Sequence, residues 1–411
     1  MEAEAVVLVG AAVVLVVTLV SGKLEDVWLT EPMVALILGL IGGIAVFGPV
    51  DLESPLILTL LELTLALVLF SDASRIEIAR LREGFDWPLR MLLVGMPVVI
   101  ALGAALTGWY LSLPLGLALL LGTILAPTDA ALAEPVLESK EVPPRVRQAL
   151  NVESGLNDGL AVPVLLIAIG IIDSEEGGSA AQALGLVLSQ LGIGIVGGLV
   201  FSWLGARVIG SGAKAGWLNP LHQKIAAVAL ALACYSSVQL LGGSGFVAVF
   251  IAGGLMSHLV RPKYDYLYDF AVAEGHSLVL IAFFIFGAGP ATDLLMRGVP
   301  WQSVVVAVAA LVVLRPISIW VSLLGRGLSR RTVVFLGWFG PRGLATVVFV
   351  LVAVDELGAL DPLIADTVTV TVLLSIVAHG LSSVPMTRWL TRMHLDEDMP
   401  EMGEAYEHPM R

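Results

Sequence analysis

The chain is 411 residues long, 57% hydrophobic and only 14% charged. Its mean hydropathy of +0.93 lies outside the range of soluble domains and predicts an integral membrane protein. The formal charge of −13 argues against a nucleic-acid partner, and the single cysteine, Cys234, excludes both a disulfide framework and a cysteine metal cluster.

Apolar windows bounded by glycine, proline and charge clusters predict an all-α protein with thirteen transmembrane helices. The windows are 5–21, 30–48, 55–71, 86–111, 113–136, 144–172, 182–208, 219–241, 245–258, 266–289, 301–325, 332–354 and 365–390. The first window follows Glu2 and Glu4 rather than basic residues, which favours a retained helix over a cleavable signal. We expect one transmembrane domain over residues 1–391 and a short acidic tail over 392–411.

Basic residues alternate between the predicted connections. The even-numbered connections hold only Arg297, whereas the odd-numbered ones and their flanks hold Lys23, Arg75, Arg80, Arg82, Arg90, Lys140, Arg145, Arg147, Arg207, Lys214, Lys224, Arg261, Lys263, Arg326, Arg330 and Arg331. By the positive-inside rule, the N-terminus lies outside and the C-terminus is cytoplasmic in a multi-pass protein of the cell (inner) membrane. Two further arginines, Arg315 and Arg342, fall within predicted spans and need buried partners.

Two predicted spans carry a proline near mid-membrane followed by a charge: "GTILAPTDAALAEP" and "FLGWFGPRGLATVV". Proline removes a backbone donor, and freed carbonyls at membrane depth need protein or water beside them. Pro127 and Pro341 each lie 122 residues after the start of a six-span group, at residues 5 and 219. This spacing predicts inverted repeats over about 5–172 and 219–390, linked by helix 182–208, with discontinuous helices five and twelve. Such repeats are typical of secondary transporters with a site at the membrane midplane.

The sixth predicted span contains "NVESGLNDG", where two polar columns lie on one helix face because residues four apart stack. Glu153 lies under Asn157, and Ser154 lies under Asp158. Acids inside a membrane are costly and mark ion paths or proton relays. We assign Glu153 to a buried arginine, which leaves Asp158 and the Asp129 of span five as ligand candidates.

A desolvated carboxylate can be neutralised by a proton or by a metal cation, and competition between the two is an exchange mechanism. Hard oxygen ligands suit an alkali cation rather than a transition metal. The sequence offers such oxygens at Asp129, Asp158, the Ser154 hydroxyl and the carbonyls freed at the Thr128 break.

Several motifs resemble the NhaP-type branch of monovalent cation:proton antiporters, relatives of the eukaryotic sodium/proton exchangers. They are "LFSDASRIE", "APTDAAL", "ESGLNDG", "GFVAVFIAG", "FFIFGA", "GPRGLATVVF" and "LLSIVAHGLS", and the pair "ESGLNDG" with "GPRGLA" is specific. The chain departs from many relatives, which continue "TDP", at Thr128-Asp129-Ala130.

The resemblance implies a homodimer in which the unwound fifth and twelfth helices cross at the midplane. It implies a cation near Asp158 with Asp129, Ser154 and the Thr128 backbone around it. It also implies that Glu153 pairs with Arg315, that Arg342 balances the crossing of the broken helices, and that Asn157 marks the electroneutral branch.

The predicted function is therefore exchange of Na⁺, or of Li⁺ or K⁺, for H⁺ in pH homeostasis, with membrane lipid as a partner, no bound cofactor and no enzymatic chemistry. With an amide at Asn157, one titrating carboxylate remains and the exchange is expected to be one-for-one. The alternatives are a cation channel and an intramembrane serine protease built on Ser244 in "GGSGF". The "GIGIVG" run lacks the preceding strand of a dinucleotide site.

Five further polar residues within or at the ends of spans are predicted to make structural contacts: Glu62, Asp72, Glu274, His276 and His379. Glu62 and Glu274 are the strongest candidates among them for tuning transport.

Overall fold

The computed structural model describes residues 3–24, 29–52, 54–75, 86–175, 177–260 and 269–392. All regular elements in these ranges are helices. Nearly all of the predicted acidic tail lies outside the described residues, as do Arg80, Arg82, Arg261 and Lys263.

The N-terminal helices correspond to the first six predicted windows. They are α1 (Ala3–Leu24), α2 (Glu31–Gly42) with the π segment η1 (Gly43–Phe47), α3 (Pro55–Arg75), α4 (Asp86–Arg90), η3 (Met91–Gly95), α5 (Met96–Tyr110), α6 (Leu115–Ile124), α7 (Ala130–Leu137) and α8 (Pro144–Glu175).

The remaining helices follow the long α9 (Ala180–Lys214). They are α10 (Pro220–Leu240), α11 (Gly245–Val260), α12 (Asp269–Phe286), η6 (Gly287–Ala291), α13 (Thr292–Arg297), α14 (Trp301–Ala309), η7 (Ala310–Leu314), α15 (Arg315–Ser322), α16 (Arg330–Trp338), α17 (Leu344–Leu357) and α18 (Pro362–Thr391).

Seven helices of the described chain are long and apolar enough to cross a membrane: 55–74, 86–110, 144–175, 180–212, 275–297, 301–322 and 362–391. Five shorter apolar helices accompany them, at 8–22, 31–47, 115–124, 225–240 and 245–256. The predicted all-helical membrane fold is confirmed.

The predicted window 266–289 ends too early, because the helix continues through η6 and α13 to Arg297. Proline removes one backbone donor from an α-helix. The π segment Gly287–Ala291 contains Pro290, and this wider turn accommodates the missing hydrogen bond without ending the helix.

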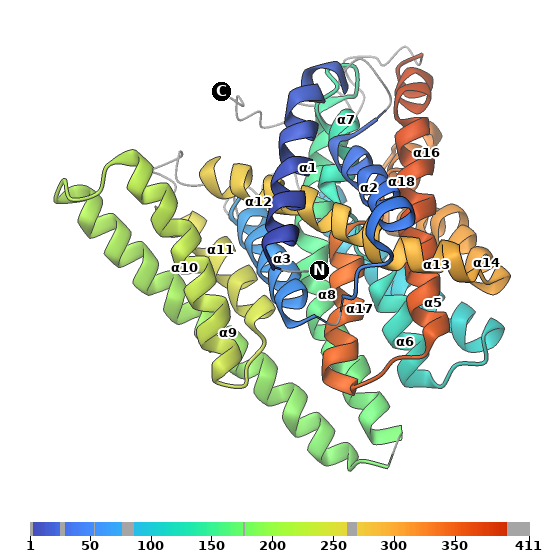
Figure 1. Ribbon diagram of the computed structural model, residues 1–411, viewed down its shortest axis with the longest axis horizontal. Helices are drawn as coiled ribbons and strands as arrows, with labels where there is room; N and C mark the ends of the chain where they lie inside the picture. The colour runs from blue at the N-terminus through green and yellow to red at the C-terminus, as the bar shows by residue number, and fades with distance from the viewer. Residues whose placement is uncertain are drawn as a thin grey trace.

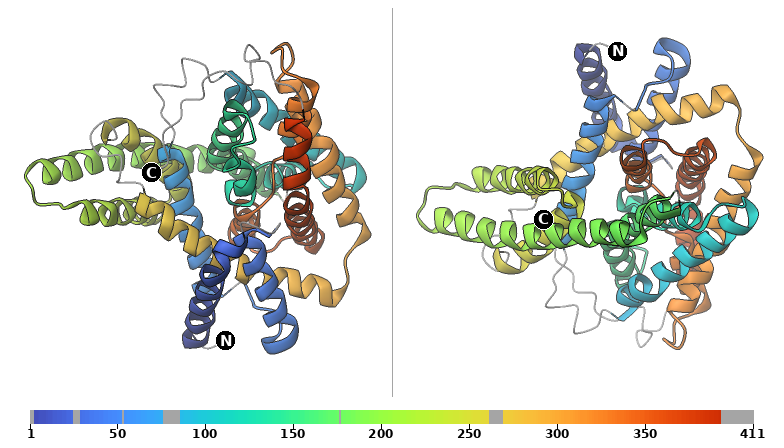
Figure 2. Two further views of the ribbon diagram at one scale, coloured as in Figure 1. Left: turned by 90° about the horizontal axis from the view of Figure 1, so that it is seen from above. Right: turned by 90° about the horizontal axis from the view of Figure 1, so that it is seen from below.

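The helices form two groups (Figure 1). Helices α9, α10 and α11 pack on one another at one side, whereas α6, α7, α8, α16, α17 and α18 lie at the other. Between them, α3 contacts both α11 and α8, and Figure 2 shows it at the junction of the two groups. The main apolar core runs through this junction and includes Phe70, Phe283 and Phe349.

Two helix pairs are interrupted around the prolines that the sequence analysis singled out. Helix α6 ends at Ile124 and α7 begins at Ala130, and α16 ends at Trp338 and α17 begins at Leu344. We call residues 125–129 the first break and residues 339–343 the second break. In Figure 1, α7 and α16 lie in the upper half of the molecule and α6 and α17 in the lower half. The breaks touch each other, because the Asp129 amide donates to the Pro341 carbonyl at 2.8 Å.

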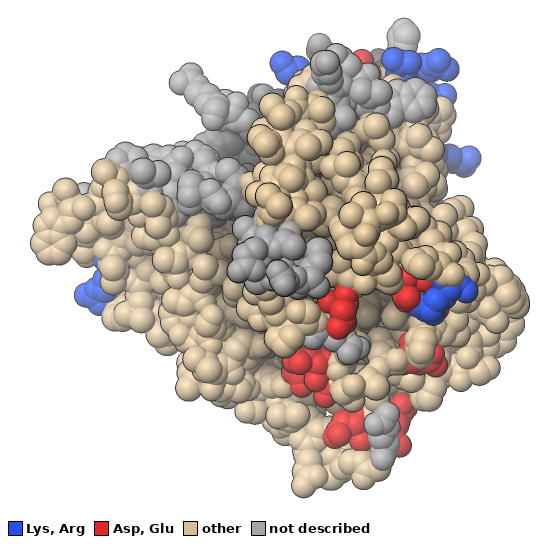
Figure 3. Space-filling view, viewed as in Figure 1, with Lys and Arg blue, Asp and Glu red and all other residues tan. Residues whose placement is uncertain are grey.

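Charged side chains separate along the same direction. On the face that Figure 3 shows, most basic side chains lie toward the top and most acidic ones toward the bottom. The α8–α9 and α17–α18 connections are at the bottom in Figure 1. Asp173 and Glu175 lie at the end of α8, Asp355 and Glu356 at the end of α17, and Asp361 in the α17–α18 connection.

Candidate functional site

The polar stripe of α8 faces the first break. Thr128 Oγ1 accepts a hydrogen bond from Asn157 Nδ2 at 2.6 Å and lies 3.0 Å from Ser154 Oγ. Thr128, Ser154 and Asn157 are at most 3% exposed. The structure therefore brings together residues of spans five and six that the sequence analysis placed at one site.

Asp129 joins the two breaks. Its Oδ1 accepts from the Ala131 amide at 2.8 Å and caps the start of α7, and its Oδ2 accepts from the Leu344 amide at 3.0 Å at the start of α17. Amides at a helix N-terminus have no partner within the helix and favour a negative charge. Each carboxylate oxygen thus accepts one backbone hydrogen bond and keeps further acceptor capacity.

Asp158 is the least satisfied acid of the site. It is 7% exposed, and its buried Oδ1 has no hydrogen-bond partner in the described structure. The neighbouring Asn157 Oδ1 is also buried without a partner. A buried carboxylate without donors is costly as an isolated anion, so Asp158 requires a proton or a cation close to its oxygens.

A second acid approaches this helix face from α3. A Cβ atom at Gly155 would lie 3.5 Å from Asp72 Cβ, so Asp72 packs where α8 has no side chain. The sequence analysis treated Asp72 as a structural polar residue. The signal for its position is Gly155, one helical turn before Asp158.

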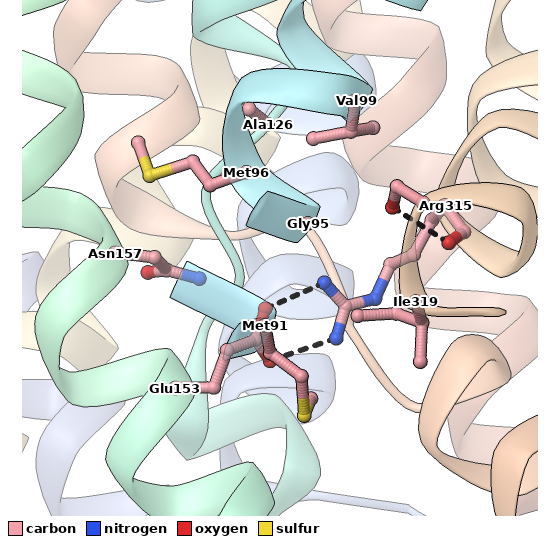
Figure 4. Close-up of a pocket in the computed structure, with 10 residues that line it drawn as sticks. Met91, Gly95, Met96, Val99, Ala126, Glu153, Asn157, Arg315 and Ile319 are labelled. Atoms are coloured by element: carbon pink, nitrogen blue, oxygen red, sulfur yellow. Dashed lines mark hydrogen bonds and ion pairs between the residues drawn. The ribbon is translucent and has the colours of Figure 1, made fainter. Parts of the chain in front are cut away.

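Glu153 and Arg315 form the ion pair that the resemblance implied. The guanidinium nitrogens Nη1 and Nη2 donate to the two Glu153 oxygens at 2.7 and 2.8 Å, and both side chains are buried (Figure 4). Arg315 Nη2 also lies 3.3 Å from the Phe339 carbonyl of the second break. The pair therefore connects α8 to the second break, and Arg315 lines a small cavity together with Asn157 and Met91.

Arg342 lies between the carbonyl ends of the two interrupted helices. It is fully buried, and it donates from Nε to the Leu125 carbonyl at 2.6 Å and from Nη1 to the Gly340 carbonyl at 2.5 Å. Carbonyl ends of helices favour a positive charge. Asp129 thus faces the amide ends of α7 and α17, and Arg342 faces the carbonyl ends of α6 and α16.

Two glycines of the second break leave room for these charges. A Cβ atom at Gly340 would overlap the Arg315 guanidinium, and a Cβ atom at Gly343 would overlap the Asp129 carboxylate. The motif "GPRG" therefore encodes close approach of two charged side chains to the backbone.

The other polar residues make contacts elsewhere. Glu62 accepts from the Tyr235 hydroxyl at 3.2 Å, and His276 Nε2 lies 2.6 Å from Glu31. The imidazole of His379 contacts the second break (see below). The side chain of Glu274 lies outside the described residues. The sequence analysis missed Ser375, although its spacing of four residues from His379 places both on one face of α18.

A family model described as "Sodium/hydrogen exchanger, transmembrane" matches residues 10–389 of the chain. The chain belongs to the sodium/hydrogen exchanger family. The family expected from the sequence motifs is thereby confirmed. The fold also agrees with a solved structure of the sodium proton antiporter MjNhaP1 from Methanocaldococcus jannaschii at pH 8. The TM-score is 0.74 at 20% identity, and the match covers 96% of this chain and 100% of that one.

Two curated members of the NhaP branch are similar to this chain. The K(+)/H(+) antiporter NhaP of Alkalimonas amylolytica is 26% identical over 381 residues, which is 92% of this chain and 64% of that protein. The K(+)/H(+) antiporter NhaP2 of Shewanella sp. (strain MR-4) is 29% identical over 296 residues, which is 70% of this chain and 50% of that protein. The chain thus spans less than two thirds of the length of these relatives.

Proposed function

We propose that this exchanger is a secondary antiporter that exchanges a monovalent cation for H⁺. Na⁺ is the first cation to test, and K⁺ and Li⁺ are the alternatives. The similar proteins include both a sodium antiporter and a potassium antiporter. The observation that carries the proposal is the buried Asp158 oxygen without a donor, beside a broken helix. A group in this state can be neutralised by H⁺ or by a cation, and the competition couples their fluxes.

The oxygens around Asp158 form the proposed cation site. Asp129, the Ser154 hydroxyl and the Thr128 backbone supply the other ligands, and Asn157 orients Thr128 through its amide donor. The sequence analysis gave Glu153 two roles, as a member of the ion- and proton-binding set and as the partner of a buried arginine. Its two hydrogen bonds to Arg315 support the second role. In each cycle Asp158 releases one ligand before it binds the other.

The membrane arrangement belongs to the same proposal. Thirteen spans in two inverted repeats, a homodimer, an outer N-terminus and a cytoplasmic C-terminus in the cell membrane are consistent with the broken helices and with the separation of charge in Figure 3. The group α9–α11 and the group around α8 and α17 provide two bodies that can rock against each other around a fixed site. The physiological role that follows is pH homeostasis.

The protease alternative lacks support from the site. Ser244 lies at the start of α11, where its hydroxyl is 3.4 Å from the Val247 amide, and the described histidines His276 and His379 bond to other groups.

Proteoliposomes with an imposed pH gradient separate an antiporter from a channel. We expect H⁺ efflux on addition of Na⁺, K⁺ or Li⁺ even when ionophores hold the membrane potential at zero. Cation flux without coupled H⁺ movement would assign a channel.

Asp129→Asn is expected to raise the half-saturating cation concentration severely, by about tenfold or more, while coupled exchange continues. The amide keeps the size of the side chain but removes one ligand charge and turns an NH₂ group toward one of the backbone amides that Asp129 caps. Initial rates over a cation series in proteoliposomes measure this. An unchanged half-saturating concentration would remove Asp129 from the cation site.

The exchange is expected to be electroneutral. An aspartate in place of Asn157 would add a second titratable carboxylate, but the amide there leaves Asp158 to alternate between one proton and one cation. The test clamps the potential of proteoliposomes at several values with potassium and valinomycin under a fixed Na⁺ gradient. We expect the pH gradient at which net flux stops to be the same at all potentials, and a systematic shift would exclude a one-for-one stoichiometry.

A further inference from the structure

Four consecutive carbonyl oxygens, from Trp338 at the end of α16 to Pro341 in the second break, accept hydrogen bonds. Trp338 O lies 2.8 Å from His379 Nε2, Phe339 O accepts from Arg315, Gly340 O accepts from Arg342, and Pro341 O accepts from the Asp129 amide. The Trp338 carbonyl also accepts from the Gly340 amide at 2.9 Å. A cation at any of these four carbonyls would have to displace a donor.

Ser375 and His379 of α18 connect the two sides of the second break. The Arg342 amide donates to Ser375 Oγ at 2.7 Å, and Ser375 Oγ lies 3.1 Å from His379 Nδ1. His379 Nδ1 is also 2.7 Å from the Ser375 carbonyl, whereas Nε2 has the Trp338 carbonyl as its partner. With its proton on Nε2, as in the neutral Nε2–H tautomer or in the charged ring, the imidazole donates to Trp338 O. Both side chains are nearly fully buried.

The first break has the opposite character. Helix α8 presents a serine and an acid four residues apart, Ser154 and Asp158, as α18 presents Ser375 and His379. Yet Asp158 Oδ1 has no partner, and within the described chain no hydrogen bond reaches the carbonyls of residues 126–128. The two breaks thus contact similar pairs of residues, but the carbonyls of residues 126–128 are free in the described structure, whereas those of residues 338–341 are paired.

We propose that Ser375 and His379 are positioning residues that close the second break, so that only the first break offers oxygens to the cation. The proposal rests on the antiporter function proposed above. It assigns to His379 a role in holding Arg342: the imidazole is the second partner of Trp338 O beside the Gly340 amide, and the guanidinium remains on Leu125 O at the end of α6. Arg342 thereby fixes the start of the first break, three residues before Thr128.

Loss of the imidazole donor has a defined consequence. The Trp338 carbonyl would then keep only the Gly340 amide as a donor, and Arg342 Nη2 is buried without a hydrogen-bond partner in the described structure. A guanidinium that turns toward α16 leaves Leu125 O, and the first break shifts with it. The cation site is then disturbed although no cation ligand has been changed.

The experiment compares His379→Leu with His379→Gln, whose amide can still donate toward Trp338 O. Two readouts are used: hydrogen exchange of residues 336–346 in the purified protein, and the cation dependence of exchange in proteoliposomes. We expect His379→Leu to accelerate hydrogen exchange and to raise the half-saturating cation concentration about tenfold, with a smaller effect on the maximal rate. His379→Gln should restore both values, and its pH profile should match that of the unmodified protein.

Ser382→Ala is the matched control. Ser382 lies one turn further along α18 and accepts the Trp338 indole N–H at 2.7 Å, so this variant removes a hydrogen bond of the same tryptophan but leaves its carbonyl paired. It should change neither readout. Ser375→Ala removes the hydroxyl that lies between the Arg342 amide and His379 Nδ1, and it tests the proposal if His379→Leu does not fold. Faster hydrogen exchange at residues 336–346 in this variant supports the proposal, and unchanged hydrogen exchange overturns it.

Two results overturn the proposal directly. Equal behaviour of His379→Leu and the unmodified protein in both readouts would show that the imidazole positions nothing. An altered pH profile in His379→Gln would identify His379 as a titrating group of the transport cycle. Failure of the unmodified protein to couple cation and H⁺ fluxes would refute the antiporter function, whereas the hydrogen-exchange comparison would still judge the closure of the second break.

Discussion

Asp158→Asn is expected to abolish coupled cation:proton exchange and to leave a folded protein. The amide can neither release a proton nor supply a full negative charge to a cation, and Asp158 Oδ1 makes no hydrogen bond on which the described fold depends. Proton movement driven by a cation gradient in proteoliposomes measures exchange, and the elution profile and unfolding temperature in detergent report the fold. The expected loss is at least about 100-fold in rate, because the carrier of both ligands is removed.

Two further variants sharpen this test. Asp158→Glu keeps a carboxylate and should retain slower, coupled exchange. Asp173→Asn removes an exposed acid from the end of the same helix and should leave exchange unchanged. If Asp158→Asn still moves protons against a cation gradient, another residue carries the exchange and the proposed mechanism is wrong.

The sequence predicted the interruptions because their cause is local. A proline within an apolar window removes a backbone donor wherever the helix packs, so Pro127 and Pro341 marked both breaks. The polar column of α8 was also predictable, since residues four apart share a helix face. The π segments were not predictable, because the apolar windows that contain them read as uninterrupted helices.

The order of residues in the sequence does not show which of the buried acids and arginines pair with each other. Three acids and two arginines fall in the same part of the membrane, and their spacing alone does not say which groups pair. In the structure both Asp129 oxygens accept backbone hydrogen bonds, one at the start of α7 and one at the start of α17, in addition to the proposed role of Asp129 as a cation ligand. The closure of the second break by Ser375 and His379 depends on how α18 packs against α16, a tertiary contact without a local signal.

The two breaks differ in how their oxygens are paired, and this difference supports a single site in the proposed antiporter. Unpaired oxygens at membrane depth are costly, and each break exposes carbonyls that need partners. At the second break the protein supplies these partners itself, through His379, Arg315, Arg342 and the Asp129 amide. At the first break the oxygens Asp158 Oδ1 and Asn157 Oδ1 remain without partners, and in the proposed function they are satisfied by the exchanged cation or proton.

The buried pair Glu153–Arg315 gives the second large prediction, which concerns stability. Glu153→Gln or Arg315→Leu alone should each lower the free energy of unfolding by about 3–5 kcal/mol, because each leaves the other charge in a low-dielectric interior. Arg315→Leu also removes the donor to Phe339 O. Apparent unfolding temperatures and the yield of monodisperse protein in detergent measure the loss.

The double variant Glu153→Gln/Arg315→Leu should recover part of that loss, since no unpaired charge remains. A double-mutant cycle then gives a coupling energy of about 2 kcal/mol or more, within the range measured for residues in contact. The control cycle uses Asp86 and Arg326, an ion pair whose side chains are 43% and 37% exposed. Its coupling should stay below about 1 kcal/mol, because water screens both charges. If the effects of Glu153→Gln and Arg315→Leu simply add, the two residues are not coupled in the membrane-embedded protein, and α8 is held to the second break by other contacts.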